Sequence, residues 1–282
     1  MKPQHERERL ILQFVALLLA LTIPVAQDAS PPVAPAPEAP APAAASVIDP
    51  KVDQILTDLE SAGASVKNLR SQIRYKVVDT LNFDEYVKHG EIIFMDDQPN
   101  PKFHIAFDKR EQGGVVNRDR EWWTFDGRWL WEVNEGVGQV MQREVVAPGE
   151  KIDLFNIETA PFPIPFGQKK DQILKHFDVT LVAQKSDDPA NTDHLRCVPK
   201  PGSRLADDYD LLDFYILKDL HLPNRIVATE KLASKLIVSD FPDLSAKSIN
   251  PGVDKKRFEP LQEWKQFGMP IVETLEKAEE KK

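Results

Sequence analysis

Apolar residues recur at two different spacings along the chain, and the change of spacing predicts where a helix gives way to strands. Residues 50–62 carry apolar side chains at every third or fourth position, behind Asp49 and Pro50, a pair typical of a helix start. From Leu69 onward the apolar residues instead come in short runs separated by turns, which is typical of β-strands. The pattern therefore predicts one opening helix followed by a mainly β domain.

The strands follow one another closely in the first half of this domain. The segments SQIRYKVVDT, EYVKHGEIIFMD and KFHIAFD are three successive predicted strands, and in the third Phe103, Ile105 and Phe107 share one face. The Asp126–Gly127 pair is a hairpin turn signal between aromatic runs, since both positions tolerate a positive φ. Further strands are predicted at 137–145, 178–184, 193–198, 210–217, 224–230 and 234–239. About ten strands in this arrangement predict a large antiparallel sheet or barrel.

One segment interrupts the strands. In APFPIPFGQKKDQILKHF, three large apolar residues alternate with prolines that cannot donate to a sheet ladder: Phe162, Ile164 and Phe166. A helix is predicted to follow at 168–176. We expect this segment to lie over the sheet as a lid, and helices 50–62 and 168–176 to cover its concave face.

The two ends of the chain differ in composition from the middle. Basic residues precede an apolar run from Leu10 to about Pro24, which is shorter than the roughly 20 residues of a membrane-spanning helix. Residues 1–29 are therefore predicted to be a secretory signal, with an uncleaved membrane anchor as the alternative. Residues 30–47, rich in proline and alanine, form an extended linker. The domain is then expected at 48–255, with a C-terminal extension at 256–282.

Composition limits the classes of partner. The 45 acidic residues outnumber the 36 lysines and arginines, and the formal net charge of −9 disfavours nucleic acids and anionic bilayers as partners. A single cysteine, Cys197, allows no intrachain disulfide, so stability must come from the core. We expect a monomer.

The sequence shows no established catalytic or metal-binding motif. It contains no G-x-S-x-G, no Walker A loop, no H-E-x-x-H and no C-x-x-C. A lone strand histidine such as His104 is typical of a surface or core position, and the acidic run at 207–210 is typical of a solvated turn rather than a calcium loop. We therefore expect no enzyme activity, no metal and no cofactor.

Aromatic residues suggest apolar chemistry instead. Four of the five tryptophans fall between 122 and 131, and Trp122 and Trp123 must point to opposite faces of one strand. Apolar side chains on both faces require cover on both sides. Two explanations stay open: helices on one face with loops on the other, or a ligand cavity.

The order of the motifs adds a family resemblance. The signal, the helix, GEIIFMDDQPNPKFHIAF, FDGRWLWEV and GQVMQREVV together resemble the periplasmic lipoprotein carriers of the LolA type. The features that carry the resemblance are Gly90, Pro99, Phe103 and the run at 126–131, followed downstream by a strand ending in Pro199–Lys200.

The resemblance implies an unclosed antiparallel β-barrel whose helices cover an apolar cavity on the concave face. It also implies a periplasmic chaperone that takes acylated lipoproteins from an inner-membrane donor to an outer-membrane acceptor. We expect the acyl chains to be lined by Phe94, Phe103, Trp129 and Trp131.

One position departs from that family. Related carriers have an arginine just before the proline turn, where it helps to latch the lid, and this chain has Gln98 there. Glutamine forms hydrogen bonds but carries no charge, so the latch works differently or the ligand is another lipid. The alternative function is an envelope sensor or regulator that binds a lipid or a partner protein on the same half-barrel.

Overall fold

The computed structural model describes residues 48–97, 99–152, 167–203, 205–259 and 262–275. Residues 50–282 group into one compact unit. The predicted signal and linker, the latch position Gln98 and the lid residues Phe162, Ile164 and Phe166 lie outside the described residues. Within the described part, no helix combines the length and the hydropathy that crossing a membrane would require.

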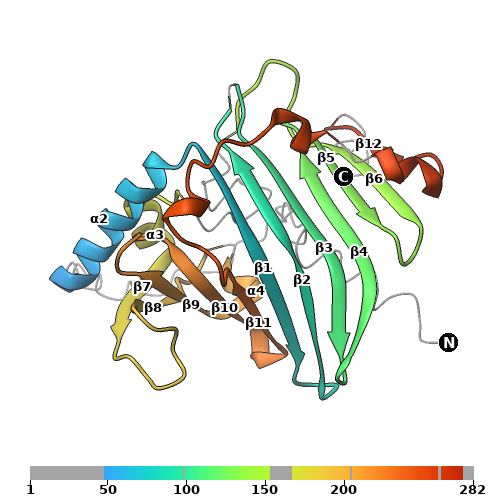
Figure 1. Ribbon diagram of the computed structural model, residues 1–282. Coiled ribbons are helices and arrows are strands. Elements are labelled where there is room, and N and C mark those ends of the chain that lie inside the picture. Colours follow the sequence, from blue (N-terminus) through green and yellow to red (C-terminus); the bar gives the residue numbers. More distant parts are fainter. Residues whose placement is uncertain (1–47, 98, 153–166, 204, 260–261, 276–282) are drawn as a thin grey trace, which may run out of the picture. The chain divides into compact units, whose positions relative to one another are not determined.

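A helix, α2 (Pro50–Ser65), precedes the sheet, as the apolar spacing predicts (Figure 1). The strands of the first half are β1 (Asn68–Asp79), β2 (Asp84–Met95), β3 (Lys102–Gln112), β4 (Val115–Phe125), β5 (Trp129–Asn134) and β6 (Gln139–Glu144). The second half contains α3 (Lys170–His176), β7 (Phe177–Val182), β8 (Thr192–Pro199), α4 (Leu205–Asp208), β9 (Tyr209–Leu217), β10 (Pro223–Glu230) and β11 (Lys235–Asp240). Short 3-10 helices η1 (Lys231–Ala233), η2 (Ala246–Ser248), η3 (Lys255–Phe258) and η4 (Gln262–Phe267) and a last strand, β12 (Ile271–Glu273), complete the chain.

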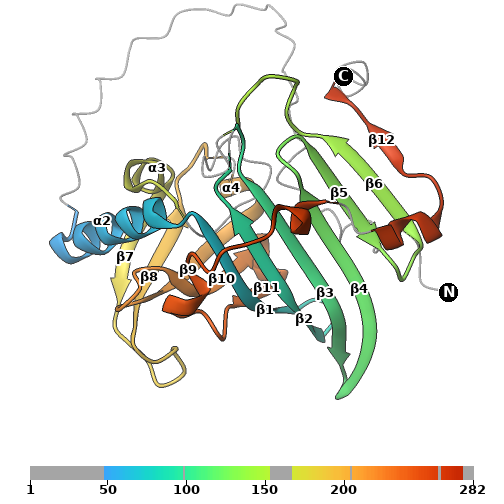
Figure 2. The ribbon, with the colours of Figure 1, turned by 45° about the horizontal axis from the view of Figure 1, so that its top comes forward.

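All the strands belong to one 12-stranded sheet, in the order β12-β6-β5-β4-β3-β2-β1-β11-β10-β9-β8-β7. Neighbouring strands are antiparallel except β12, which pairs in parallel with β6 (Figure 2). The sheet is strongly curved, and β7 and β12 stand at its two edges, so it does not close. The prediction of a mainly β, unclosed antiparallel barrel with about ten strands is confirmed.

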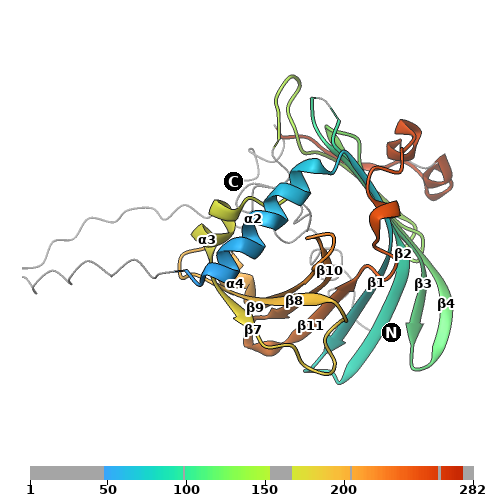
Figure 3. The same ribbon diagram turned by 60° about the vertical axis from the view of Figure 1, so that its left-hand side comes forward.

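The concave side of the sheet carries the long helix. Figure 3 shows α2 lying across the opening, with α3 beside it. Its apolar stripe is buried: Val52, Ile55, Leu56 and Leu59. Lys170 of α3 forms an ion pair of 2.6 Å with Asp53, and its amide donates to Glu60. A Cβ on Gly63 would lie only 2.5 Å from the Cα of Gly167, so glycine permits this close approach.

The convex side is covered by the C-terminal residues. Phe258 of η3 is buried, and Arg257 beside it pairs with Glu91 of β2. Phe267 of η4 packs on a buried cluster of Trp122, Val133 and Val140. The residues after 255, which composition alone sets apart from the domain, thus contribute to the packing of the sheet.

Candidate functional site

Cross-strand pairing defines which side chains share the concave face, because directly paired residues of an antiparallel sheet point to the same side. Three rows run across β1 to β5 on this face. The first row is Leu69, Phe94, Phe103, Phe125 and Leu130; the second is Ser71, Ile92, Ile105, Trp123 and Glu132; the third is Ile73, Gly90, Phe107, Glu121 and Asn134.

The first row is entirely apolar. Each of its five side chains is at most 2% exposed, and the rings of Phe103 and Phe125 stack with their centroids 5.7 Å apart. The next two rows continue with Trp123, whose ring meets Phe107 edge-on at 6.0 Å. Phe107 also contacts Tyr75 at 5.9 Å. Together these side chains make an apolar wall on the inner side of the sheet, hereafter the aromatic end.

A backbone irregularity sits in the middle of this wall. The pairing of β2 with β3 shifts between His89 and Gly90, so that β3 carries one extra residue there. A Cβ on Gly90 would lie 1.9 Å from the carbonyl oxygen of Ala106, which no side chain tolerates. Glycine at position 90, one of the residues that carry the family resemblance, is therefore required by the close approach of β3.

Charged residues also occupy inward positions. Lys88 and Glu121 form an ion pair of 2.6 Å, and Asn134 donates to the other oxygen of Glu121 at 2.9 Å. Both ionic side chains are almost fully buried. Alternation within one strand places Tyr86 and Lys88 on the same face as Phe94, so the sequence contains a sign of these inward positions. Until the pairing of the strands is known, however, a lysine at such a position is interpreted as a surface residue.

Glu132 is the buried acid nearest the aromatic end. Its oxygen accepts from Arg143 at 2.7 Å, and Arg143 also pairs with Glu273 of β12. Burial raises the pKa of Glu132 to about 7; Arg143 and the Trp123 indole act in the opposite direction, while Glu273 adds to the rise. Burial thus favours the protonated form of this carboxyl, while its contact with Arg143 favours the carboxylate.

The expected acyl-lining residues divide between the two faces. Phe94 and Phe103 lie in the first concave row. Trp131 pairs with Thr124, and Trp129 lies two residues before it, so both point to the convex side. There Trp131 packs against the cluster of Trp122, Val133 and Val140 instead of lining an inner cavity. The expectation that all four residues line one concave surface is corrected for the two tryptophans, because alternation along β5 turns them outward.

The convex face carries its own polar groups. His104 is buried and its Nδ1 lies 2.8 Å from the hydroxyl of Thr124. Burial, with Arg257 adding to it, lowers the pKa of His104 to about 4, so the ring is neutral near physiological pH. The part of the chain that the structure describes contains no cluster of His, Cys, Asp and Glu that could hold a metal ion.

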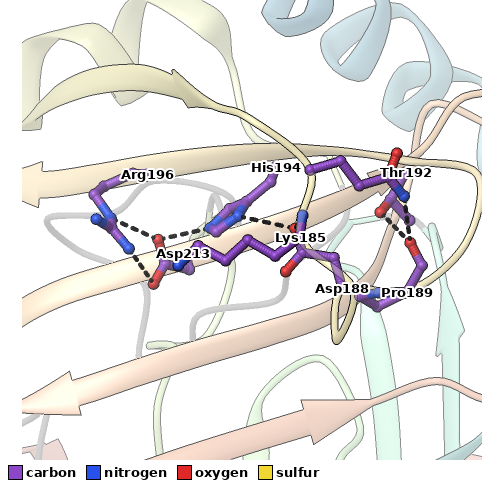
Figure 4. A network of polar contacts seen from close by, with 8 residues as sticks. Lys185, Asp188, Pro189, Thr192, His194, Arg196 and Asp213 are labelled. Carbon is purple, nitrogen blue, oxygen red and sulfur yellow. Dashed lines mark hydrogen bonds and ion pairs between the residues drawn. The ribbon is translucent and has the colours of Figure 1, made fainter.

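A second histidine joins two strands and a loop on the same convex side (Figure 4). The Nε2 of His194 lies 2.9 Å from Asp213, which also binds Arg196, and its Nδ1 faces Asp188 at 3.6 Å. Burial alone would raise the pKa of Asp188, but the Lys185 amide, His194 and Tyr215 lower it below its ordinary value. These contacts tie the loop after β7 to β8 and β9, and they lie away from the aromatic end.

Comparison with known proteins gives only remote structural similarity. No protein-family model matches the chain, and no curated protein matches its sequence. Among solved structures, a DUF1329 family protein from Desulfovibrio piger matches 73% of this chain and 95% of its own, with 12% identity and a TM-score of 0.38.

Two further structures match over a similar span. A putative outer membrane lipoprotein-sorting protein domain from Vibrio parahaemolyticus covers 73% of this chain and 97% of its own, at 10% identity and a TM-score of 0.35. LprF from Mycobacterium bovis covers 73% and 99%, at 14% identity and a TM-score of 0.37. With TM-scores this low, these similarities assign no activity to the chain.

Proposed function

We propose that this protein is a periplasmic carrier that binds the acyl chains of lipoproteins or lipids against the aromatic end of the concave face. The observation that carries the proposal is the inward row of Leu69, Phe94, Phe103, Phe125 and Leu130, on the side of an open sheet that α2 spans. Each buried methylene contributes about 0.8 kcal/mol, so one long acyl chain represents on the order of 10 kcal/mol gross.

Binding alone is enough for such a function. A carrier needs no covalent step, only an apolar wall that excludes water. Cys197, the single thiol, is buried, and burial raises its pKa well above the ordinary value, which keeps it an unreactive thiol. These features favour a binding protein over an enzyme.

We further propose a segment that covers the bound acyl chain and a direction of transfer between the two membranes. Phe162, Ile164 and Phe166 would cover the aromatic end and give way to cargo, so that the contacts they lose reduce the net affinity and permit release. Gln98 would take the latch position without a charge. The signal at 1–29 would direct the chain to the periplasm, where a donor at the inner membrane loads it and an acceptor at the outer membrane unloads it.

A paired experiment tests the lid. The double variant Phe162→Ser, Phe166→Ser should change the affinity for a fluorescent fatty-acyl probe and leave the β-sheet signal in circular dichroism intact. The matched control is Val115→Ser, Val116→Ser, which removes two apolar side chains that are more than half exposed at the β3–β4 hairpin. Unchanged affinity in the lid variant would make this segment ordinary packing.

Mass spectrometry of the protein purified in its native state identifies the cargo class. Copurified acylated peptides would support a lipoprotein carrier, whereas free lipid would favour a general lipid-binding protein. A chain that contains neither, and that binds no acyl probe, would contradict both functions.

A further inference from the structure

The concave face changes character beyond Phe107. The next inward residues are Tyr75, Lys88 and Arg110, which pair across β1, β2 and β3, followed by Tyr86. With Glu121 in the preceding row, these positions place polar and charged side chains beside the aromatic end. We call Tyr86, Lys88, Arg110 and Glu121 the polar end.

Two of the four residues of the polar end, Lys88 and Glu121, bind each other. Lys88 binds Glu121, and Asn134 holds the second oxygen of that carboxylate. A buried ion pair of this kind costs desolvation energy that its own attraction only partly returns, so it contributes little net stability. Its presence at the inner end of an apolar face is therefore not explained by the stability of the fold.

The other two residues, Arg110 and Tyr86, have hydrogen-bond donors without an acceptor. The guanidinium carbon of Arg110 lies 4.0 Å from the centre of the Tyr86 ring, a cation–π contact. The Nε of Arg110 and the hydroxyl of Tyr86 are both buried and have no hydrogen-bond partner among the described residues. An unmet buried donor costs about 1–3 kcal/mol, and more when it is charged. Two of them side by side indicate a missing acceptor.

Charge identifies the kind of acceptor. Arginine is always protonated, and burial raises the pKa of Tyr86 well above its ordinary value, so both groups donate at every physiological pH. Lys88 is already paired with Glu121, whereas Arg110 stacks on the Tyr86 ring. Asp84 and Asp119 influence Tyr86 from farther along β2 and β4, and Asp84 accepts from Gln112. The unused donors thus match an oxyanion with several acceptor oxygens.

We propose that Tyr86 and Arg110, with Lys88 beside them, bind the phosphate-type oxyanion of an acyl ligand's head group while its chain lies along the aromatic end. This inference rests on the proposed acyl binding and narrows the ligand to lipids with an anionic head group. Arg110 offers a planar fork to two oxygens and Tyr86 donates to a third position. Phe107, the last ring of the aromatic end, lies next to this subsite along β3.

Titration of the full-length protein with two probes of equal chain length tests the subsite. Lysophosphatidic acid carries the phosphate, and the corresponding monoacylglycerol lacks it. Arg110→Gln should weaken lysophosphatidic acid binding about ten-fold, and Tyr86→Phe should weaken it less, since it keeps the ring under Arg110. Neither variant should change monoacylglycerol binding. Lys109→Gln, an exposed neighbour that pairs with His89 on the other face, is the matched control.

Each result separates this inference from the proposed function. If the wild type binds both probes equally and Arg110→Gln has no effect, the subsite is wrong while acyl binding stands. Equal loss for both probes would make Arg110 a purely structural residue. If neither probe binds, the proposed function itself fails. Displacement of lysophosphatidic acid by millimolar inorganic phosphate would assign the donors to a free anion and overturn the head-group assignment.

Discussion

Trp122 and Trp123 are neighbours in β4 and are both buried, yet they belong to different surfaces. Trp123 faces inward and meets Phe107, and its pairing partner on β5 is Glu132. Trp122 faces outward into the cluster with Val133 and Val140, over which Phe267 packs. The chain itself closes the outer surface with its C-terminal residues. The inner surface presents an apolar wall beside polar groups, which is the arrangement that an amphipathic ligand requires.

A dense aromatic run in the sequence can therefore contribute to two separate surfaces. Period-two alternation sends successive rings to opposite sides, so half of this run packs under the C-terminal residues and half faces the concave side. Burial cannot distinguish the two roles, since Phe94 and Trp122 are each 1% exposed. The two roles can be told apart only by which residues cover each set of rings.

Replacing each of the two tryptophans by alanine compares the two faces directly. Trp122→Ala and Trp123→Ala should each lower the free energy of unfolding by about 3–5 kcal/mol, because each leaves a large gap in a packed layer. In protein that remains folded, only Trp123→Ala should weaken binding of the acyl probe. Urea denaturation and probe titration at low temperature measure the two quantities. A loss of probe affinity in Trp122→Ala, with none in Trp123→Ala, would reverse the assignment of the faces.

Much of this architecture follows from the sequence. The helical spacing of residues 50–62 matches α2, and the turn signal at Asp126–Gly127 lies between β4 and β5, where Gly127 has a φ of +104° and Asp126 accepts from two following amides. The inward set Phe103, Ile105 and Phe107 was also apparent from alternation within one strand.

What the sequence does not show is the register between separate strands. The pairing of Phe125 with Leu130 across the hairpin decides which residues of β5 face inward, and no local pattern marks it. The prediction therefore placed Trp129 and Trp131 beside Phe103, although they face the other side. The polar first half of β4 and the three-residue β12 were missed because neither has an alternating apolar pattern.

Replacing Phe267 tests how much the C-terminal residues contribute to packing on the outer surface. Phe267→Ala should lower the free energy of unfolding by about 1–2 kcal/mol, because the side chain is only partly buried against Trp122 and Val140. Probe affinity should not change. Met269→Ala, at a position 89% exposed, is the control and should alter neither quantity. A reduced affinity in Phe267→Ala would connect the outer cluster to binding and weaken the distinction between the faces.

The two faces should also differ in the sign of their pH dependence. The pKa of Glu132 is raised to about 7 in the folded protein, against about 4.3 when unfolded. The stability that its protonated form contributes is complete below the unfolded value and is lost as the pH rises through 7. The pKa of His104 is lowered to about 4, against about 6.5 when unfolded. Its contribution is complete above 6.5 and is lost as the pH falls toward 4.

Urea denaturation at several pH values between 4 and 8 separates the two contributions. Relative to the wild type, Glu132→Gln should remove a decline in stability as the pH rises, and His104→Gln should remove a decline as the pH falls. Glu135→Gln, which alters a more exposed acid that pairs with Arg118, should leave both slopes in place. If Glu132→Gln and His104→Gln change the slope in the same direction, the inner carboxyl is ionised like a surface acid. The concave face would then be wet at Glu132, and the dry wall proposed for acyl chains would have to end before the second row.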